Sequence, residues 1–362
     1  MKQWENNVRA VTPYVPGEQP KQQGLIKLNT NENPYPPSPS VQQALGQMDA
    51  HSFRLYPDPE ASQLTGAIAD RYGVSERQVF VGVGSDDVLS LAFLTFFNGK
   101  KPILFPEITY SFYRVWATVY QIPFRCVPLD EQLHIRASDY VSAAGTVGGI
   151  VFPNPNAPTG AALSLADVEE IVRANRDVVV IVDEAYIDFG AKSALPLVET
   201  YDNLLVVQTF SKSRSMAGVR IGYAIGDERL IAYLKSVKES VNSYTMNMPS
   251  IVLGVAALED ERYFQETCAE IIRTRELVGQ KLASMGFRFP QSQANFLFVT
   301  HPDYNAKELF LALRENNIYV RYFDQPGLRD YLRITIGTPE QMGQLIAFLE
   351  EYAARDGGGQ RV

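Results

Sequence analysis

Two apolar runs of the sequence end in side chains that could carry out chemistry. The run Leu204–Thr209 is followed by Ser211 and Lys212. The run Val178–Val182 is followed by Asp183. A buried strand that ends in an amine or an acid delivers that group to the sheet edge where ligands bind. Together the two ends predict an amine that bonds to an aldehyde close to a carboxylate, which is covalent catalysis.

Pyridoxal phosphate needs an amine, an acid, a donor to its ring oxygen, a ring-stacking group and an anion cradle, and the sequence has a candidate for each. Lys212 is the expected amine, and it becomes the base that moves the substrate's Cα proton once the substrate displaces it. A base must be neutral, so the pKa of Lys212 has to fall. We expect burial beside the cationic Arg220 to lower it.

Asp183 is the expected partner of the pyridine nitrogen of the cofactor. At about 4 Å an ion pair contributes about 4 kcal/mol, which is enough to keep that nitrogen protonated. The alternative role for Asp183 is that of a helix N-cap. Tyr186, three residues later, is expected to donate a hydrogen bond to the ring oxygen.

An anion cradle is expected where the strand 79–83 ends and a helix begins, because a helix N-terminus offers free N–H groups and a favourable dipole. Its residues are Gly84, Ser85 and Asp86, and Ser211 and Arg220 complete the phosphate shell. A plain N-cap is the alternative role for Ser85. Asp87 stands where a dinucleotide fingerprint needs its third glycine, so a nicotinamide enzyme is disfavoured. Tyr110 is expected to stack on the cofactor ring, the alternative being a packing aromatic.

Helices and short apolar strands alternate around these residues, which is typical of an α/β fold with a mostly parallel sheet covered on both faces. We expect helices over 40–48, 62–72, 86–97, 112–119, 165–174, 306–316 and 339–353, with a long helical region over 249–285 broken around 259–262. We expect strands over 79–83, 102–105, 149–152, 178–182, 204–209, 220–224, 296–299, 318–321 and 331–336.

The order of these elements predicts a large domain followed by a smaller α+β domain. Residues 1–40 are rich in proline, glycine and asparagine and read as an extended N-terminal arm that packs with the small domain. Residues 41–265 form the expected large cofactor-binding domain and 266–355 the small domain. Residues 356–362 are expected to be a flexible tail.

Composition narrows the class of protein. The 362 residues include 33 lysines and arginines against 41 acidic residues, a formal charge of −8, which disfavours nucleic acid or an anionic membrane as partner. Neither Cys126 and Cys268 nor the three dispersed histidines have the spacing of a metal site. The N-terminus lacks a signal peptide's apolar core, and no apolar stretch is long enough to span a membrane. We expect a cytoplasmic enzyme.

The chain resembles the fold-type I aminotransferases, and among them the histidinol-phosphate aminotransferases. The resemblance runs through nearly the whole chain and is carried by the segments 28–34 (LNTNENP), 56–58 (YPD), 154–160 (NPNAPTG), 183–186 (DEAY) and 211–212 (SK). These motifs are specific for fold and cofactor and less specific for the substrate.

The resemblance implies a homodimer in which Tyr56 reaches the phosphate of the neighbouring subunit's cofactor. It implies transfer of an amino group from L-histidinol phosphate to 2-oxoglutarate in two half-reactions, giving imidazole-acetol phosphate and L-glutamate in histidine biosynthesis. It also implies that Arg333 binds the carboxylate of glutamate or the phosphate of histidinol phosphate, with Arg321 and Tyr14 assisting at the phosphate.

One position departs from the family pattern. Where the family has an asparagine that bonds to the ring oxygen, this chain has Ala157. Asn156, one residue earlier, is a candidate replacement, and the alternative is that Tyr186 holds the oxygen alone. The rival activities of the same fold are an aromatic amino acid aminotransferase and a threonine-phosphate decarboxylase. A cofactor-binding regulator without turnover is disfavoured, because the chain has neither room nor basic charge for a DNA-binding domain.

Overall fold

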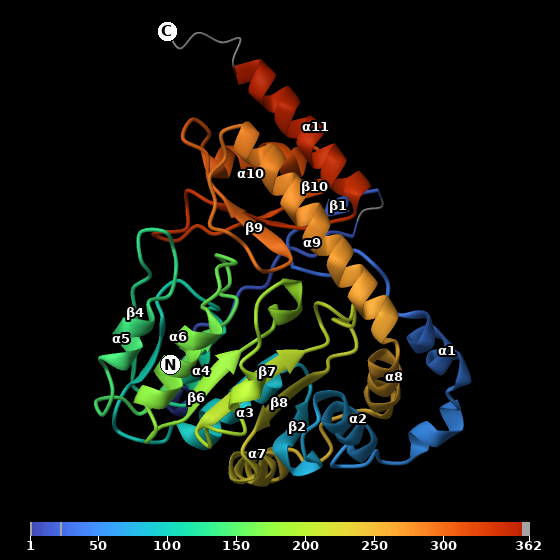
Figure 1. The fold of residues 1–362 in the computed structure, drawn as a ribbon, viewed down its shortest axis with the longest axis vertical. Coiled ribbons are helices and arrows are strands. Elements are labelled where there is room, and N and C mark those ends of the chain that lie inside the picture. The colour runs from blue at the N-terminus through green and yellow to red at the C-terminus, as the bar shows by residue number, and fades with distance from the viewer. Residues whose placement is uncertain (1, 22–23, 357–362) are drawn as a thin grey trace.

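The computed structural model describes residues 2–21 and 24–356, and its centre is a seven-stranded sheet (Figure 1). The strand order is β2 (Val79–Gly82), β8 (Gly222–Gly226), β7 (Leu204–Thr209), β6 (Val180–Asp183), β5 (Gly149–Pro153), β3 (Ile103–Pro106) and β4 (Phe124–Val127). Neighbouring strands from β7 to β4 are parallel, whereas β8 is antiparallel to both β7 and β2. The expected α/β fold with a mostly parallel sheet is confirmed.

The antiparallel direction of β8 matters for the position of Arg220. The carboxyl ends of the parallel strands meet at one edge of the sheet, and an antiparallel strand begins at that same edge. Arg220 lies just before β8, with a left-handed backbone (φ 61°), and not inside the strand 220–224 that the sequence predicts. The segment that precedes β8 therefore lies beside the segments that follow β2, β6 and β7.

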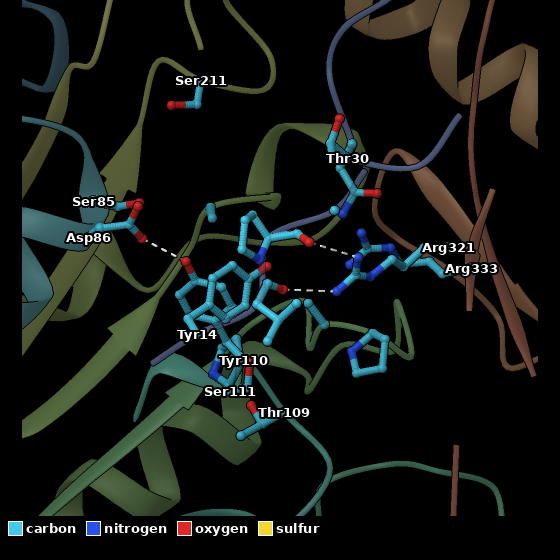
Figure 2. Close-up of a pocket in the computed structure, with 18 of the residues that line it drawn as sticks. Tyr14, Thr30, Ser85, Asp86, Thr109, Tyr110, Ser111, Ser211, Arg321 and Arg333 are labelled. Carbon is cyan, nitrogen blue, oxygen red and sulfur yellow. Dashed lines mark hydrogen bonds between the residues drawn. The ribbon is translucent and has the colours of Figure 1, made fainter. Parts of the chain in front are cut away.

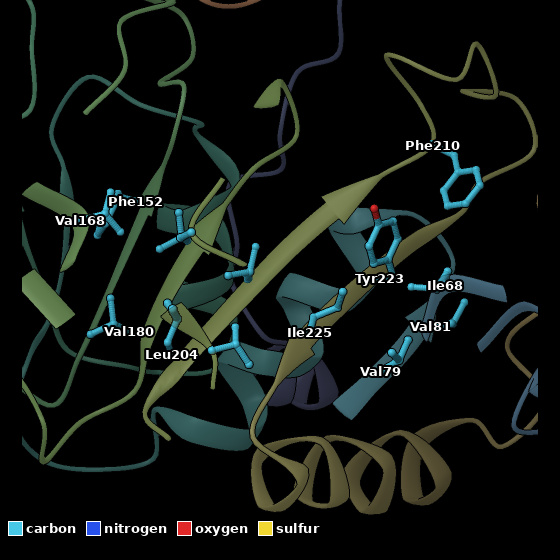
Figure 3. Packing of buried hydrophobic residues seen from close by; sticks show 14 of the residues in the cluster. Ile68, Val79, Val81, Phe152, Val168, Val180, Leu204, Phe210, Tyr223 and Ile225 are labelled. Carbon is cyan, nitrogen blue, oxygen red and sulfur yellow. The ribbon is translucent and has the colours of Figure 1, made fainter. Parts of the chain in front are cut away.

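Helices cover both faces of this sheet. One face carries α1 (Pro39–Gln47), α2 (Ser62–Tyr72), α5 (Ala137–Val141), α6 (Leu165–Ala174) and α8 (Met248–Glu259). The other carries α3 (Ser85–Phe96), α4 (Phe112–Val119) and α7 (Glu228–Val241). Side chains alternate along β6, so that Val180 and Val182 belong to the first layer and Ile181 to the second. Figure 3 shows the first layer, in which Val180 and Leu204 from neighbouring strands lie side by side.

A second, smaller assembly lies above the large sheet in Figure 1. It contains the antiparallel sheet β11 (Arg321–Tyr322), β12 (Leu332–Thr335) and β9 (Phe296–Val299), and the parallel pair β1 (Ile26–Lys27) and β10 (Ile318–Tyr319). The helices α9 (Glu261–Ser284), α10 (Ala306–Glu315) and α11 (Pro339–Asp356) pack on these strands around a separate apolar core. Short 3-10 helices lie at Gln3–Asn7, Ala50–Arg54, Glu76–Gln78, Ile187–Phe189 and Leu195–Leu197.

Most expected elements are present, and the differences have local causes. The sequence analysis misses β4, an edge strand that is only partly buried, and the short helix α5. It also misses α7, of which only Ile231, Leu234 and Lys238 are buried. The expected strand 318–321 divides at Val320, because β10 pairs with β1 whereas β11 pairs with β12.

The described residues also bear on the expected domain boundaries, membrane spans and metal sites. The expected boundary after residue 265 falls within α9. The expected tail lies outside the described residues except for Asp356, the last residue of α11. Over residues 2–21 and 24–356, no helix is long and apolar enough to cross a lipid bilayer. In the same ranges, no group of three or more histidine, cysteine or acidic side chains could hold a metal ion.

Candidate active site

A cavity of about 910 Å³ lies between the carboxyl edge of the large sheet, the small antiparallel sheet and the N-terminal arm. Most of the expected site residues line it: Tyr14, Ser85, Asp86, Tyr110, Asp183, Tyr186, Ser211, Lys212, Arg220, Arg321 and Arg333. Figure 2 shows Ser85, Asp86 and Ser211 on one side of the cavity and Arg321 and Arg333 on the opposite side. Strand ends of the large sheet supply the first group, and strands β11 and β12 supply the two arginines.

Lys212 follows the carboxyl end of β7, and it lines the cavity. Its Nζ donates a hydrogen bond to the backbone carbonyl of Thr30 at 3.2 Å, and it lies 5.9 Å from the centre of the Tyr186 ring. Burial lowers the pKa of Lys212 to about 8, and the nearby guanidinium of Arg333 is the second cause. Burial is a cause that the sequence predicts, whereas Arg220, the cation expected beside it, has the smaller effect of the two arginines.

Asp183 is the last residue of β6, and its carboxyl group is buried. Tyr113 Oη donates to Asp183 Oδ2 at 2.7 Å, and the backbone N–H of Ala185 donates to Oδ1 at 3.2 Å. Burial raises the pKa of Asp183 to about 6, against the opposing effect of these two donors. The next helical segment is the 3-10 helix Ile187–Phe189, and its N-cap is Tyr186, so the alternative role of Asp183 as a helix N-cap is wrong.

The N-terminus of α3 lies where the sequence predicts an anion cradle. The N-cap is Gly84, with φ 82°, so the alternative N-cap role for Ser85 is wrong. A Cβ atom at Gly84 would lie 2.5 Å from Nη2 of Arg220, and a Cβ atom at Gly222 would lie 2.2 Å from the backbone nitrogen of Ser85. The start of β8 therefore approaches the helix N-terminus more closely than any residue with a side chain permits. This approach brings a guanidinium beside free helical N–H groups.

Asp86 connects this cradle to the aromatic side of the cavity. Its Oδ2 accepts from Arg220 Nη2 at 3.2 Å, and its Oδ1 accepts from Tyr110 Oη at 2.7 Å. The Tyr110 ring lies edge-on to Tyr113, with centres 5.8 Å apart. Ser211 Oγ lies 3.5 Å from Arg220 Nη1, at the limit of a hydrogen bond. The orientation of the Tyr110 ring is thus set by an acid of the cradle.

The opposite side of the cavity is cationic, and backbone carbonyls of the arm satisfy its arginines. Arg321 donates to the carbonyls of Val15 and Pro16 at 3.0 and 3.2 Å. Arg333 donates from Nη2 to the carbonyl of Asn29 at 3.0 Å, and its Nε is buried without a hydrogen-bond partner among the described residues. Burial lowers the pKa of Arg333. The guanidinium groups carry no carboxylate partner in these contacts and can accept an anionic ligand.

Tyr14 fixes the arm against the large sheet. Its ring stacks on Phe112 of α4, with centres 4.4 Å apart and planes 25° apart. It also lies near Tyr110, at 6.3 Å between ring centres. The arm therefore contacts α4 through Tyr14 and β11 through the carbonyls that bind Arg321, and it closes one wall of the cavity.

Three of the expected site residues do not line the cavity. Gly84 lies behind Ser85 and acts through its backbone conformation. Asn156 is buried, and its amide is used within the protein by the carbonyl of Ile108 and the hydroxyl groups of Thr109 and Thr159. Tyr56 is 81% exposed and stacks on Tyr244 at 4.7 Å.

Several contacts at the cavity escape the sequence analysis. Tyr186 Oη accepts a hydrogen bond from Asn31 Nδ2 at 2.9 Å, and Asn33 Nδ2 donates to the carbonyl of Lys212 at 3.0 Å. The segment 28–34 is recognised in the sequence as a motif, but its side chains are given no role. The left-handed backbone of Asn31 (φ 56°), which asparagine tolerates better than most residues, is the available signal.

The residues of this cavity fit pyridoxal phosphate. The cradle that a Cβ atom at Gly84 would fill suits a phosphate, and a buried carboxylate suits a protonated pyridine nitrogen. Lys212 has an amine of lowered pKa for the aldehyde. Asn31 and Tyr186 place an amide and a phenol together on one wall of the cavity, and these groups could bind a ring oxygen.

The buried carboxyl of Asp183 makes the cofactor-free protein less stable as the pH rises. Its pKa is about 6 in the folded chain and 3.8 in an exposed aspartate, so the folded state binds more protons between these values and loses about 3 kcal/mol of unfolding free energy by pH 7. We expect cofactor-free Asp183→Asn to be more stable than the wild type at pH 7.5 and equally stable near pH 4. Urea denaturation at both values measures the difference. Exposed Asp177→Asn is the control, and an equal difference at both pH values would contradict the expectation.

Arg333 should control the proton affinity of Lys212. In the cofactor-free wild type, we expect the rate at which an amine-reactive reagent modifies Lys212, followed by peptide mass spectrometry, to rise with a midpoint near pH 8. Arg333→Gln removes a positive charge beside the amine and should move this midpoint to higher pH. Arg321 is not among the main causes of the Lys212 shift, so Arg321→Gln should leave the midpoint in place. Equal midpoints in all three proteins would refute this assignment.

Comparison with known proteins identifies the family. Residues 23–349 match the family model of class I and II aminotransferases. The chain is 52% identical over 348 residues to histidinol-phosphate aminotransferase 1 of Hydrogenovibrio crunogenus, covering 96% of this chain and 97% of that protein. It is 51% identical over 349 residues to the histidinol-phosphate aminotransferase of Aromatoleum aromaticum, covering 96% and 98%.

A solved structure has the same fold. The crystal structure of histidinol-phosphate aminotransferase from Sinorhizobium meliloti in complex with pyridoxal 5'-phosphate matches with a TM-score of 0.82, at 24% identity and over 90% of each chain. The expected fold-type I architecture and the expected family are confirmed. The chain belongs to the class I and II aminotransferases and, within them, to the histidinol-phosphate aminotransferase family.

Proposed function

We propose that this enzyme transfers the amino group of L-histidinol phosphate to 2-oxoglutarate, giving imidazole-acetol phosphate and L-glutamate in histidine biosynthesis. Its cofactor is pyridoxal phosphate. The observation that carries the proposal is the shared cavity, which contains the buried acid Asp183 and the amine of Lys212, with its lowered pKa. Arg321 and Arg333 lie in the same cavity, and neither pairs with a carboxylate of the residues that the structure describes.

All expected site residues except Asn156 keep a role in this proposal. Pyridoxal phosphate, when bound, supplies an aldehyde that takes up amino groups and a ring that withdraws electrons. Lys212 would hold this aldehyde covalently and, once free, would carry the substrate's Cα proton as base and acid. A pKa of about 8 keeps a useful fraction of this amine neutral near neutral pH. Asp183 holds the ring nitrogen, and Tyr186 donates to the ring oxygen.

The remaining residues hold the cofactor phosphate and the ring face. The phosphate is bound by Ser85, Asp86 through its backbone, Ser211 and Arg220, on the conformation that Gly84 permits. Tyr110 stacks on the ring, held by its bond to Asp86. Asn156 is not given a direct contact with the cofactor, because its amide is already bonded within the protein and does not line the cavity. Asn31 takes the place of the family asparagine that is missing at Ala157, through its bond to Tyr186.

The two arginines explain how one cavity serves two anionic substrates, a phosphate and a carboxylate. A phosphate and a carboxylate both accept paired hydrogen bonds from a planar guanidinium. Arg333 presents a buried Nε with no partner among the described residues, and Arg321 exchanges arm carbonyls for the anion. Tyr14 also lines the cavity, where its hydroxyl assists at the phosphate. The aromatic rings around it would also accommodate phenylalanine or tyrosine, so the choice of donor has to be measured.

The amino donor and the role of Lys212 are tested together. We expect steady-state assays with 2-oxoglutarate to give the highest kcat/KM for L-histidinol phosphate, with lower values for phenylalanine and tyrosine and no carbon dioxide from threonine phosphate. Lys212→Ala should lower turnover by at least about a thousandfold, because both covalent and proton-transfer catalysis are lost. The exposed Lys192→Ala is the matched control. Normal turnover by Lys212→Ala would refute the mechanism, and a preference for tyrosine would redirect the proposal to aromatic amino acids.

We also propose a homodimer whose interface includes Tyr56. Phe53, Leu55 and Tyr56 are exposed next to one another in the sequence, and Tyr244 packs on Tyr56. Large apolar side chains exposed together are typical of protein–protein contacts. In the dimer, Tyr56 reaches the cofactor phosphate of the partner subunit. Both cysteines are free, which supports a reducing compartment, and we propose the cytoplasm.

Mixed dimers test the contribution of Tyr56 across the interface. Tyr56→Phe keeps the stacked ring and removes the hydroxyl, and should weaken cofactor binding about tenfold. A dimer of one Tyr56→Phe chain and one Lys212→Ala chain has one intact site if Tyr56 acts on the partner subunit. Differently tagged chains that are co-expressed and purified as mixed dimers should then bind cofactor at one site with wild-type affinity. If Tyr56 acts within its own chain, the mixed dimer has no intact site and the affinity stays that of Tyr56→Phe.

A further inference from the structure

Tyr113 lies behind the cavity, in the first turns of α4, and it does not line the cavity. Its side chain is fully buried, and its hydroxyl donates to Asp183 Oδ2 at 2.7 Å. Among the described residues this is the one side-chain hydrogen bond that Asp183 receives, the second bond being that from the backbone of Ala185. Tyr113 therefore contacts Asp183 from the side that faces away from the cavity.

The position of the Tyr113 hydroxyl is fixed by its surroundings. The ring packs against Phe93 and Phe105, with centres 6.1 and 6.0 Å away, and lies edge-on to Tyr110 at 5.8 Å. Trp116 lies at 6.2 Å on the next turn of α4. A ring enclosed in this way cannot turn its hydroxyl to another acceptor. The oxygen that it binds is consequently held in one orientation.

Tyr113 remains a hydrogen-bond donor at all pH values in which the enzyme works. Burial and the neighbouring carboxylate of Asp183 raise the pKa of Tyr113 well above its usual value. At Asp183 the same bond opposes burial, which raises the pKa of the acid to about 6. Without the donor, the buried carboxylate would be less stable as an anion, because a hydrogen bond to the charged form is what favours it.

We propose that Tyr113 is a positioning residue for transamination, which orients the Asp183 carboxylate and keeps it anionic for the ring nitrogen of the cofactor. This inference rests on the proposed role of Asp183. It adds a residue outside the cavity to the machinery that makes the cofactor ring electron-withdrawing. Two tyrosines of the same segment therefore bind two acids of the site. Tyr110 donates a hydrogen bond to Asp86, and Tyr113 donates one to Asp183.

Tyr113→Phe tests the role, and Tyr140→Phe is the matched control. Tyr140 is also fully buried, and its hydroxyl has no hydrogen-bond partner among the described residues. We expect Tyr113→Phe to bind pyridoxal phosphate about tenfold more weakly and to lower kcat about tenfold with KM nearly unchanged, as the loss of one hydrogen bond to a charged group predicts. The acidic limb of its kcat/KM profile should move to higher pH, because protonation of Asp183 becomes easier.

Cofactor titration of the cofactor-free proteins and pH profiles separate the outcomes. Tyr140→Phe should match the wild type in both. Equal cofactor affinity and equal acidic limbs in Tyr113→Phe and Tyr140→Phe would overturn the inference. If Tyr113→Phe does not fold, 3-fluorotyrosine at position 113 keeps the ring and is a stronger donor, so it should move the acidic limb to lower pH. An unmoved limb in that protein would also overturn it.

The test of Tyr113 remains valid even if L-histidinol phosphate is not the substrate. Cofactor affinity is measured without any amino donor, so it does not depend on whether L-histidinol phosphate is the substrate. If the enzyme prefers another donor and the two tyrosine variants still differ, the substrate proposal fails and the role of Tyr113 stands. If Asp183→Asn binds the cofactor as tightly as the wild type, the role of Asp183 fails, and with it the inference on Tyr113.

Discussion

The site depends on the carboxylate of Asp183, which is buried and has no ion-pair partner among the described residues. An isolated anion in a protein interior is costly, and burial raises the pKa of Asp183 to about 6 for this reason. Two donors, Tyr113 and the backbone of Ala185, offset part of the cost. In the proposed function, the protonated ring nitrogen of the cofactor would supply the missing positive charge. Cofactor binding would then be coupled to the charge state of one acid at the end of β6.

Three cationic side chains of the cavity, unlike Asp183, have backbone carbonyls as their partners. Lys212, Arg321 and Arg333 each donate to backbone carbonyls of the N-terminal arm. Carbonyl dipoles satisfy a donor without neutralising its charge, so the cations remain available to an anionic substrate. A carboxylate in the same place would have to be displaced. The arm thus keeps the substrate side of the cavity positive, and the neighbouring charge of Arg333 helps to lower the pKa of Lys212.

Strand ends could be predicted from the sequence because a buried strand followed by a reactive side chain is a local pattern. Lys212 and Asp183 lie where that pattern places them. Arg220 lies outside the strand that the sequence predicts for it. Its left-handed backbone depends on how closely β8 approaches α3, and no local sequence pattern shows this approach. The bond between Tyr113 and Asp183 joins residues 70 positions apart, and α4 reads as an ordinary packed helix. Asn156 is a residue of the expected type at nearly the expected position, but its amide forms its hydrogen bonds within the protein and does not face the cavity.

The reversed direction of β8 is what completes the phosphate side of the site. If β8 ran parallel to β7, the segment before it would lie at the far edge of the sheet, and Arg220 would be a strand length away from α3. Because β8 is antiparallel, its first residues meet the N-terminus of α3, and Gly84 and Gly222 leave room for the approach. Asp86 then bonds to both Arg220 and Tyr110. One strand direction therefore links the guanidinium of Arg220, through Asp86, to the ring of Tyr110.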